Sequence, residues 1–363
     1  MQIYLFLIIS SMCIYLLNKY MKNETIEKTL TFILFFILFI ISAIRKHVGT
    51  DYGTYQYVYT SIKDREYDKE GMEIGYFYLN KLVYNLFGGE YAIFIITSLI
   101  IIVLTYITIK KFSVDPIFSG ILFMCLLYIT GFNIIRQHIA VAIIFYSLRY
   151  CETKIKWIIP IIIASLFHIT SLFVIPFYFI AKLNLNRKYY IIISAIGGGL
   201  YLGYGRTVIY LTNFIEGFQQ YRGTNFITEG ANPMRTFINI FILIFCLVSY
   251  EEIMRYKKIK FSFNMMIFGV ICSLFMIKGK IFARIVDYFT IYVIILIPYV
   301  VVNMKKYNLK KYTIIIITFI MLASYGYFYY SVKTGQSGVV PYKTYIYDRN
   351  LKEKVKSLFY KVE

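Results

Sequence analysis

The chain has 363 residues, of which 59% are hydrophobic and only 16% are charged. A soluble globule cannot hide so much apolar side-chain area, so the composition excludes a soluble protein and indicates a polytopic membrane protein. Lys and Arg outnumber Asp and Glu by 39 to 19, which gives a formal net charge of +20. On a membrane chain this excess is typical of orientation signals and of contact with anionic membrane lipid, and we do not expect nucleic acid as a partner.

Apolar runs occur along the whole chain. The first, 3–17, has no basic leader and no small-residue cleavage motif, so we expect it to be retained as a membrane span. The others lie at 30–44, 91–109, 116–130, 134–148, 157–167, 169–181, 189–202, 236–250, 265–277, 285–302 and 312–330. They predict an all-α polytopic integral membrane protein, a single transmembrane domain over 1–363 with about 12 transmembrane helices.

The segment 157–181 is either one long span or two spans that meet at His168, and positive charge favours two. With two, the short loops on one side of the membrane carry Lys and Arg at a clearly higher density than the other side. With one, the basic segments 255–260 and 305–311 would lie outside, against the positive-inside rule. We therefore expect twelve spans with both termini outside.

This orientation places two long loops, 45–90 and 203–235, and the C-terminal tail 331–363 on the external side. Long loops that are not evidently disordered are usually functional. Apolar residues at helical spacing within 75–87 predict a helix that lies on the membrane interface. The basic stretch 349–361 predicts a short surface helix against lipid headgroups.

A dense polar cluster begins where the second apolar run ends and reads RKHVGTDYGTY from Arg45 to Tyr55. Arg45 either snorkels at a helix end or, because Gly49 and Gly53 let the chain fold back, shares a pocket with the carboxylate of Asp51. Asp51 is otherwise a surface turn residue. The cluster is the first candidate for a functional site.

Other ionisable residues stand at predicted external span ends. Arg136, followed by Gln137, opens the run 134–148 and must face a cavity or a partner, since a guanidinium facing lipid is costly. Arg284 opens another span, where an in-helix ion pair with Asp287 is the alternative role. His168 is either a packing histidine or a proton acceptor on the outer face.

These residue types fit one chemistry. Several arginines at one external cavity suit a phosphate or diphosphate, because each guanidinium offers paired donors to phosphate oxygens. In a bacterial membrane the prominent external diphosphate is the head of a polyprenyl-linked glycan. Transfer of that glycan to a hydroxyl needs a base, which Asp51, His168 or Glu73 can supply, Glu73 being otherwise a solvated carboxylate. The arginines stabilise the departing diphosphate, and the scheme requires no metal and no cofactor.

The chain resembles the EpsG family of exopolysaccharide proteins, relatives of the Wzy-type polymerases. The stretches that carry the resemblance are Arg45 through Val48-Gly49-Thr50-Asp51 to Tyr55, Ile135-Arg136-Gln137 with Ala140, Phe167-His168, Arg284 with Tyr288-Phe289, and Pro341-Tyr342. Ile169 departs from the pattern, because a small residue or proline is expected after His168. The resemblance implies a polymerase of capsule, O-antigen or exopolysaccharide in the bacterial cytoplasmic membrane. The external arginines are then its functional residues.

The predicted catalytic residues are Asp51, His168 and Glu73, and the predicted substrate-binding residues are Arg45, Arg136, Gln137, Arg284 and Tyr55. The expected partners are a polyprenyl-diphosphate-linked oligosaccharide, membrane lipid, and the flippase and chain-length regulator of the same pathway. Three alternatives stay open. A polyprenyl-phosphate-sugar glycosyltransferase would place paired acidic residues in the first external loop, and a flippase or transporter would place charges near the bilayer midplane. A membrane acyltransferase also uses polar span ends and a histidine.

Overall fold

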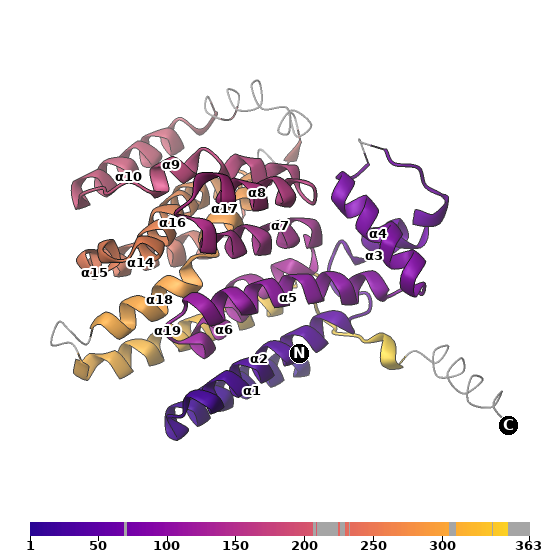
Figure 1. Cartoon of the computed structure of the whole chain (residues 1–363), viewed down its shortest axis with the longest axis horizontal. Helices are drawn as coiled ribbons and strands as arrows, with labels where there is room; N and C mark the ends of the chain where they lie inside the picture. Colours follow the sequence, from indigo (N-terminus) through magenta and orange to yellow (C-terminus); the bar gives the residue numbers. More distant parts are fainter. Residues whose placement is uncertain are drawn as a thin grey trace. The chain divides into compact units, whose positions relative to one another are not determined.

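The computed structural model describes residues 1–68, 71–205, 208, 224–225, 229–231, 233–304, 310–335 and 337–347 (Figure 1). Their secondary structure is helical and includes no β-strand, which confirms the all-α prediction for this part of the chain. The basic stretch 349–361 and most of the loop 203–235 lie outside the described residues. The chain divides into two compact units, each described by itself. The first comprises Met1–Tyr106, Gly120–His138 and Ile320–Glu363, and the second comprises Ile107–Ser119 and Ile139–Phe319.

Five of the described helices are long and apolar enough to cross a membrane. They are α1 (Gln2–Met21), α2 (Glu24–Ala43), α5 (Ala92–Phe112), α16 (Lys257–Met276) and, from Tyr312 onward, α19 (Lys310–Lys333). A sixth span results if η6 (Lys280–Phe282) and α17 (Ala283–Thr290) cross together with α18 (Val293–Asn303), from which they are bent by 49°. Length and composition therefore support a multi-pass membrane protein with five or six spans in the described part.

Fewer than twelve of the described helices are long enough to cross a membrane, so the predicted count of about twelve spans is not confirmed. The remaining apolar runs also form helices, but shorter ones than the roughly 20 residues that cross the hydrocarbon. These are α6 (Pro116–Phe123) with the π-helical η2 (Met124–Tyr128), α7 (Ile135–Tyr146), α8 (Lys154–Ser165), η5 (Ile169–Val174), α9 (Phe177–Ala181), α10 (Arg187–Leu202) and α14 (Met234–Val248). Apolar composition does not distinguish a short helix packed inside protein from a helix that crosses a membrane.

A tight turn joins α1 to α2, which lie side by side in the first unit (Figure 1). Lys22 ends α1 with a left-handed φ of 48°, and its N–H donates to the carbonyl of Asn18. Asn23 then caps α2, because its side chain accepts hydrogen bonds from the N–H groups of Thr25 and Ile26. Such a cap contributes about 1 kcal/mol. The first two spans are thereby fixed as a hairpin.

The predicted break at His168 is present in the second unit. The backbone is extended at His168, between α8 and η5. The ring of Trp157, near the start of α8, lies 4.7 Å from the ring of Tyr178 in α9. One continuous helix would separate these residues by about 30 Å. The chain therefore reverses its direction near His168, and 157–181 is a pair of segments rather than a single span.

α16 is the most enclosed of the span-length helices, and α9, α10, α14, α17 and α18 pack around it in the second unit (Figure 1). The approach of α17 depends on Gly269. A Cβ atom at that position would lie 2.7 Å from Cγ2 of Thr290 and 3.0 Å from Cβ of Phe289. α17 therefore lies directly against the backbone of α16.

The long loop 45–90 of the first unit is largely helical. It contains α3 (Tyr52–Thr60), the short turn η1 (Ile62–Asp64) and α4 (Ile74–Phe87). Both η1 and α3 pack against α4 (Figure 1). The helix predicted over 75–87 is therefore confirmed, although part of the apolar face predicted for lipid packs against protein instead.

The end of α2 is held by residues 337–345, called here the C-terminal segment, which belong to the same unit. Arg45 and Thr344 form an isolated antiparallel β-bridge. The N–H of Lys46 donates to the carbonyl of Lys343 at 2.9 Å. The residues that follow α2 are thus joined to the C-terminal segment by backbone hydrogen bonds.

Asn133 ties this junction to a third part of the sequence. Its Oδ1 accepts a hydrogen bond from the N–H of Thr50 at 2.9 Å, and its Nδ2 donates to the carbonyl of Ser337 at 3.1 Å. Between them the N–H of Gly49 donates to the carbonyl of Gly338 at 3.0 Å. Three segments far apart in sequence are therefore interlocked around Gly49.

Gly49 allows the closest contact in this junction, and we expect Gly49→Ala to destabilise the protein. Gly49 has a φ of 109°, and a Cβ there would lie 2.6 Å from Oδ1 of Asn133 and 3.0 Å from the carbonyl oxygen of Phe132. The substitution should lower the free energy of unfolding by roughly 1–3 kcal/mol, measured as a lower midpoint of thermal unfolding in detergent. Gly53→Ala is the matched control, because a Cβ at Gly53 in α3 meets no atom within 4 Å. Equal midpoints for the two variants would contradict the prediction.

Candidate functional site

Arg45 is enclosed within the first unit and only 2% exposed. Its Nη1 donates to the carbonyl of Ser42 and, at 3.4 Å, to the hydroxyl of Ser98. The guanidinium carbon lies 4.6 Å from the ring centre of Phe132 and 5.2 Å from that of Phe94. Each such cation–π contact contributes about 0.5–2 kcal/mol. The partners of Arg45 are therefore groups of the protein itself.

A cavity of about 20 Å³ adjoins Arg45 and is lined by Ser42, Ser98, Tyr128 and His138 together with apolar side chains. This is the room that a single water molecule needs, and a diphosphate does not fit. Burial lowers the pKa of the Arg45 guanidinium, while the nearby Tyr128 hydroxyl acts in the opposite direction. An arginine keeps its charge under such a shift, so the cavity holds a permanent positive charge.

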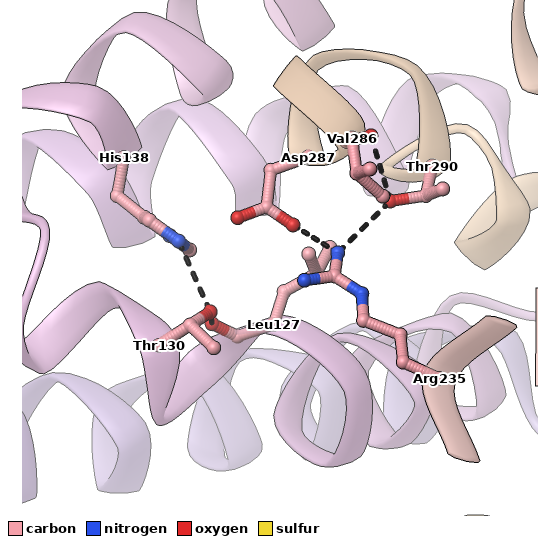
Figure 2. A network of polar contacts seen from close by, with 7 residues as sticks. All are labelled: Leu127, Thr130, His138, Arg235, Val286, Asp287 and Thr290. Carbon is pink, nitrogen blue, oxygen red and sulfur yellow. Dashed lines mark hydrogen bonds and ion pairs between the residues drawn. The ribbon is translucent and has the colours of Figure 1, made fainter. Parts of the chain in front are cut away.

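His138 belongs to the wall of this cavity and is fixed by a hydrogen bond. Its Nε2 lies 3.1 Å from the hydroxyl of Thr130, and that hydroxyl donates to the carbonyl of Leu127 at 2.7 Å (Figure 2). The two contacts fix the orientation of the His138 ring.

The predicted pocket shared by Arg45 and Asp51 does not form. Asp51 is a half-buried residue that precedes α3, and its Oδ1 accepts a hydrogen bond from the hydroxyl of Thr50 at 3.0 Å. Within the described residues no ion pair joins Asp51 to Arg45. The physical reason is that the ring faces hold Arg45 in the interior, while the positive φ of Gly49 redirects the chain before Asp51.

Four predicted site residues do come together in the first unit, and we call Asp51, Tyr55, Glu73 and Arg136 the arginine–carboxylate cluster. Nη1 of Arg136, at the start of α7, lies 2.6 Å from Oε2 of Glu73, which precedes α4. Their side chains are 33% and 16% exposed. Arg136 therefore satisfies the expectation that a guanidinium at this position faces a partner, and a third of its surface stays accessible.

Tyr55 completes the cluster from α3. Burial raises the pKa of its hydroxyl, and the nearby Arg136 guanidinium opposes the increase. The Asp51 carboxylate, one turn earlier, acts in the same direction as burial. The ring packs edge-on against Tyr76 of α4 with centroids 5.8 Å apart. The cluster therefore juxtaposes a cation, two carboxylates and a neutral hydroxyl.

Gln137 is buried beside Arg136 in the sequence, but its side chain is not part of the cluster. Neither its amide nitrogen nor its amide oxygen makes a hydrogen bond to a described residue. A buried amide in this state costs about 1–3 kcal/mol. The predicted contact of Gln137 with substrate stays a prediction.

Asp287, which the sequence suggests as an in-helix partner of Arg284, binds an arginine from another helix. Asp287 is buried in the second unit, and Oδ1 accepts from Nη2 of Arg235, which also donates to the hydroxyl of Thr290 at 3.2 Å (Figure 2). The Thr290 hydroxyl in turn donates to the carbonyl of Val286. Asp287 therefore binds an arginine from α14 that is distant from it in the sequence.

His168 and Arg284 are both in the second unit. Arg284 is half-buried near the start of α17, one turn before Tyr288. The hydroxyl of Tyr288 lies 3.0 Å from that of Thr170 in η5, the turn that begins directly after His168. His168 itself is buried. The two predicted residues therefore stand on elements that pack together.

Arg235 is the ionisable residue that sequence analysis missed. It stands just before the apolar run 236–250, as Arg136 and Arg284 stand at the starts of theirs. The rule that identified those two residues would also have identified Arg235.

Across the described residues, no three His, Cys, Asp or Glu side chains gather in a way that could hold a metal ion.

Comparison with known proteins identifies the family. The family model described as the EpsG family matches residues 28–344, a range that includes every predicted site residue. No curated protein and no solved structure matches the chain. Because the match covers most of the chain, the protein belongs to the EpsG family, a family of Wzy-type polysaccharide polymerase-like membrane proteins.

Proposed function

We propose that the protein is a polysaccharide polymerase that joins polyprenyl-diphosphate-linked oligosaccharide repeat units at the outer face of the bacterial cytoplasmic membrane. Family membership supports the class of reaction. The observation that carries the proposal is the partly exposed Arg136 held at 2.6 Å by Glu73. A guanidinium oriented in this way offers paired donors to diphosphate oxygens.

The proposal places the arginine–carboxylate cluster outside, in a chain of twelve spans with both termini external and external loops at 45–90 and 203–235. The distribution of Lys and Arg supports this orientation. The reversal near His168 supports it as well, because both ends of 157–181 return to one side whether or not the segments cross fully. The flippase and chain-length regulator of such a pathway are the proposed protein partners.

In the proposed reaction, a hydroxyl of one lipid-linked repeat unit attacks the anomeric carbon of another. The new glycosidic C–O bond forms as the bond from that carbon to the diphosphate breaks, and the hydroxyl proton passes to a carboxylate. Asp51 is the proposed base, since the carboxylate of Glu73 is already engaged by Arg136. Arg136 stabilises the charge that develops on the departing diphosphate, and the Tyr55 hydroxyl is a neutral donor beside it.

The remaining predicted residues receive different roles. Arg45 is a positioning residue, because its contacts hold the start of the loop that carries Asp51 and Tyr55. Gln137 stays a proposed ligand of the substrate. His168 and Arg284 stay proposed contributors from the second unit, and the chemistry assigned to the arginine–carboxylate cluster does not depend on them.

We expect Arg136→Ala to abolish long polymer and to leave single repeat units on the lipid carrier. Loss of a group that stabilises developing charge lowers turnover by about 10²–10³-fold. Gel analysis of glycan length in cells, with the protein quantified in the membrane, measures the effect. Arg136→Lys keeps the charge without the paired donors and should give short polymer. Arg65→Ala, in the same unit and outside the cluster, is the control. Normal long polymer from Arg136→Ala would contradict the proposal.

Asp51→Asn tests the assignment of the base. The amide cannot accept the proton, so kcat should fall by about 10²–10⁴-fold while the KM for lipid-linked units changes little. Turnover by purified protein in vesicles measures both constants. Asp64→Asn, an exposed carboxylate in the same loop, is the control and should leave them unchanged. An active Asp51→Asn protein together with an inactive Glu73→Gln protein would transfer the role to Glu73.

A further inference from the structure

The outer face of α4 is a stripe of exposed apolar side chains on a helix outside the span-length helices. Ile74, Tyr78, Leu82 and Leu86 recur every four residues, so they lie on one face, and Phe87 follows at the end. Their side chains are 39–65% exposed. An exposed apolar stripe of this kind indicates contact with another molecule or with lipid.

The opposite face of α4 is buried within the first unit. Tyr76, Phe77, Asn80 and Val83 are buried, and α3 and η1 pack against the helix. The Phe77 ring also meets the Tyr67 ring edge-on at 5.4 Å. The packing fixes the rotation of α4 about its axis, so the apolar stripe is turned away from the unit rather than toward it.

The connection to α5 keeps α4 close to the membrane. Residues 88–91 join Phe87 to Ala92, and Gly88 and Gly89 turn the chain with φ values of 56° and 70°. Even fully extended, this link spans at most about 18 Å. Because α5 is a candidate membrane span, the end of α4 that carries Leu86 and Phe87 lies near the bilayer surface.

Charge favours lipid as the occupant of this face. α4 contains no Asp or Glu, and its single charged residue, the exposed Lys81, is adjacent to Leu82. An apolar stripe flanked by a basic side chain is the pattern of a helix that lies in the interface and interacts with lipid phosphate. A face built for an acidic protein segment would carry more than one cation.

We propose that the outer face of α4 is inserted into the lipid leaflet at the boundary of headgroups and acyl chains. Glu73 directly precedes this helix and binds Arg136. The insertion therefore holds the arginine–carboxylate cluster near headgroup depth, where the diphosphate of a membrane-anchored carrier lies. The link between the insertion and the diphosphate of the carrier rests on the proposed function, whereas the insertion itself does not.

Nitroxide labels measure the insertion directly. Leu82→Cys, Phe36→Cys and Glu66→Cys are labelled in full-length protein whose exposed Cys13 is replaced by Cys13→Ser. The protein is placed in vesicles of phosphatidylethanolamine and phosphatidylglycerol. Phe36 is an exposed residue of the span α2 and serves as the lipid reference, and the exposed Glu66 is the aqueous reference. We expect the Leu82 label to be accessible to oxygen and not to a nickel chelate, at a depth of about 5–10 Å.

Two results would overturn the insertion. A Leu82 label as accessible to the nickel chelate as the Glu66 label would show that the stripe faces water. A label shielded from both oxygen and the nickel chelate would show that protein covers it, either another chain or a second copy. Neither outcome depends on catalytic activity, so failure of the proposed function leaves this measurement valid.

Kinetics test the link to the substrate. The double variant Leu82→Asp and Leu86→Asp should raise the KM for lipid-linked repeat units by about tenfold or more and leave kcat unchanged. Thr60→Asp adds a charge at the exposed end of the neighbouring α3, away from the stripe, and should leave KM within about twofold. An unchanged KM in the double variant would refute the role of α4 in presenting substrate.

Discussion

The enclosure of Arg45 is the constraint on which the first unit depends. A guanidinium at the end of an apolar helix must find partners, since a buried charge without them costs several kcal/mol. Within the described residues Arg45 forms no ion pair with a carboxylate, and its partners are a carbonyl, a hydroxyl and two aromatic faces. Its backbone is fixed in turn by the bridge to Thr344. The interior of the unit is thus organised around one positive charge.

This arrangement places the residues that can do chemistry. Asp51 and Tyr55 follow Arg45 after the tight passage at Gly49, and Arg136 follows Asn133, which hydrogen bonds to that same passage. Asp51 and Tyr55 on one side of the arginine–carboxylate cluster, and Arg136 on the other, are therefore positioned by the same junction around Gly49. In the proposed function Arg45 acts through its packing and not through contact with a ligand, which is consistent with a side chain that is only 2% exposed.

The helices of this protein could be predicted from the sequence, whereas the contacts between residues of different helices could not. Apolar runs identified the helices, and Asn23 and Gly49 mark a cap and a turn that local chemistry requires. The contact of Glu73 with Arg136 joins residues 63 positions apart, and hydropathy carries no information about such contacts. The Asp287 interaction shows the same limit, because the local rule suggested Arg284 as a partner and gave no indication of the contact with Arg235. Five or six helices of span length are confirmed rather than about twelve, because composition reports burial in an apolar medium without distinguishing protein from lipid.

The end of the family match coincides with the junction of the first unit. The match to the EpsG family ends at residue 344, and Thr344 is the residue that pairs with Arg45. Pro341 and Tyr342, which carry the last stretch of the resemblance, lie just before it, and the Tyr342 hydroxyl donates to the carbonyl of Ile41 at 2.6 Å. The Pro341-Tyr342 motif therefore belongs to the junction at the end of α2, together with the loop that begins at Arg45, and is not a separate feature of the tail. A chain that ended before this segment would lose the backbone hydrogen bonds that fix Arg45, Lys46 and Gly49, and with them the fixed starting point of the helix that carries Tyr55.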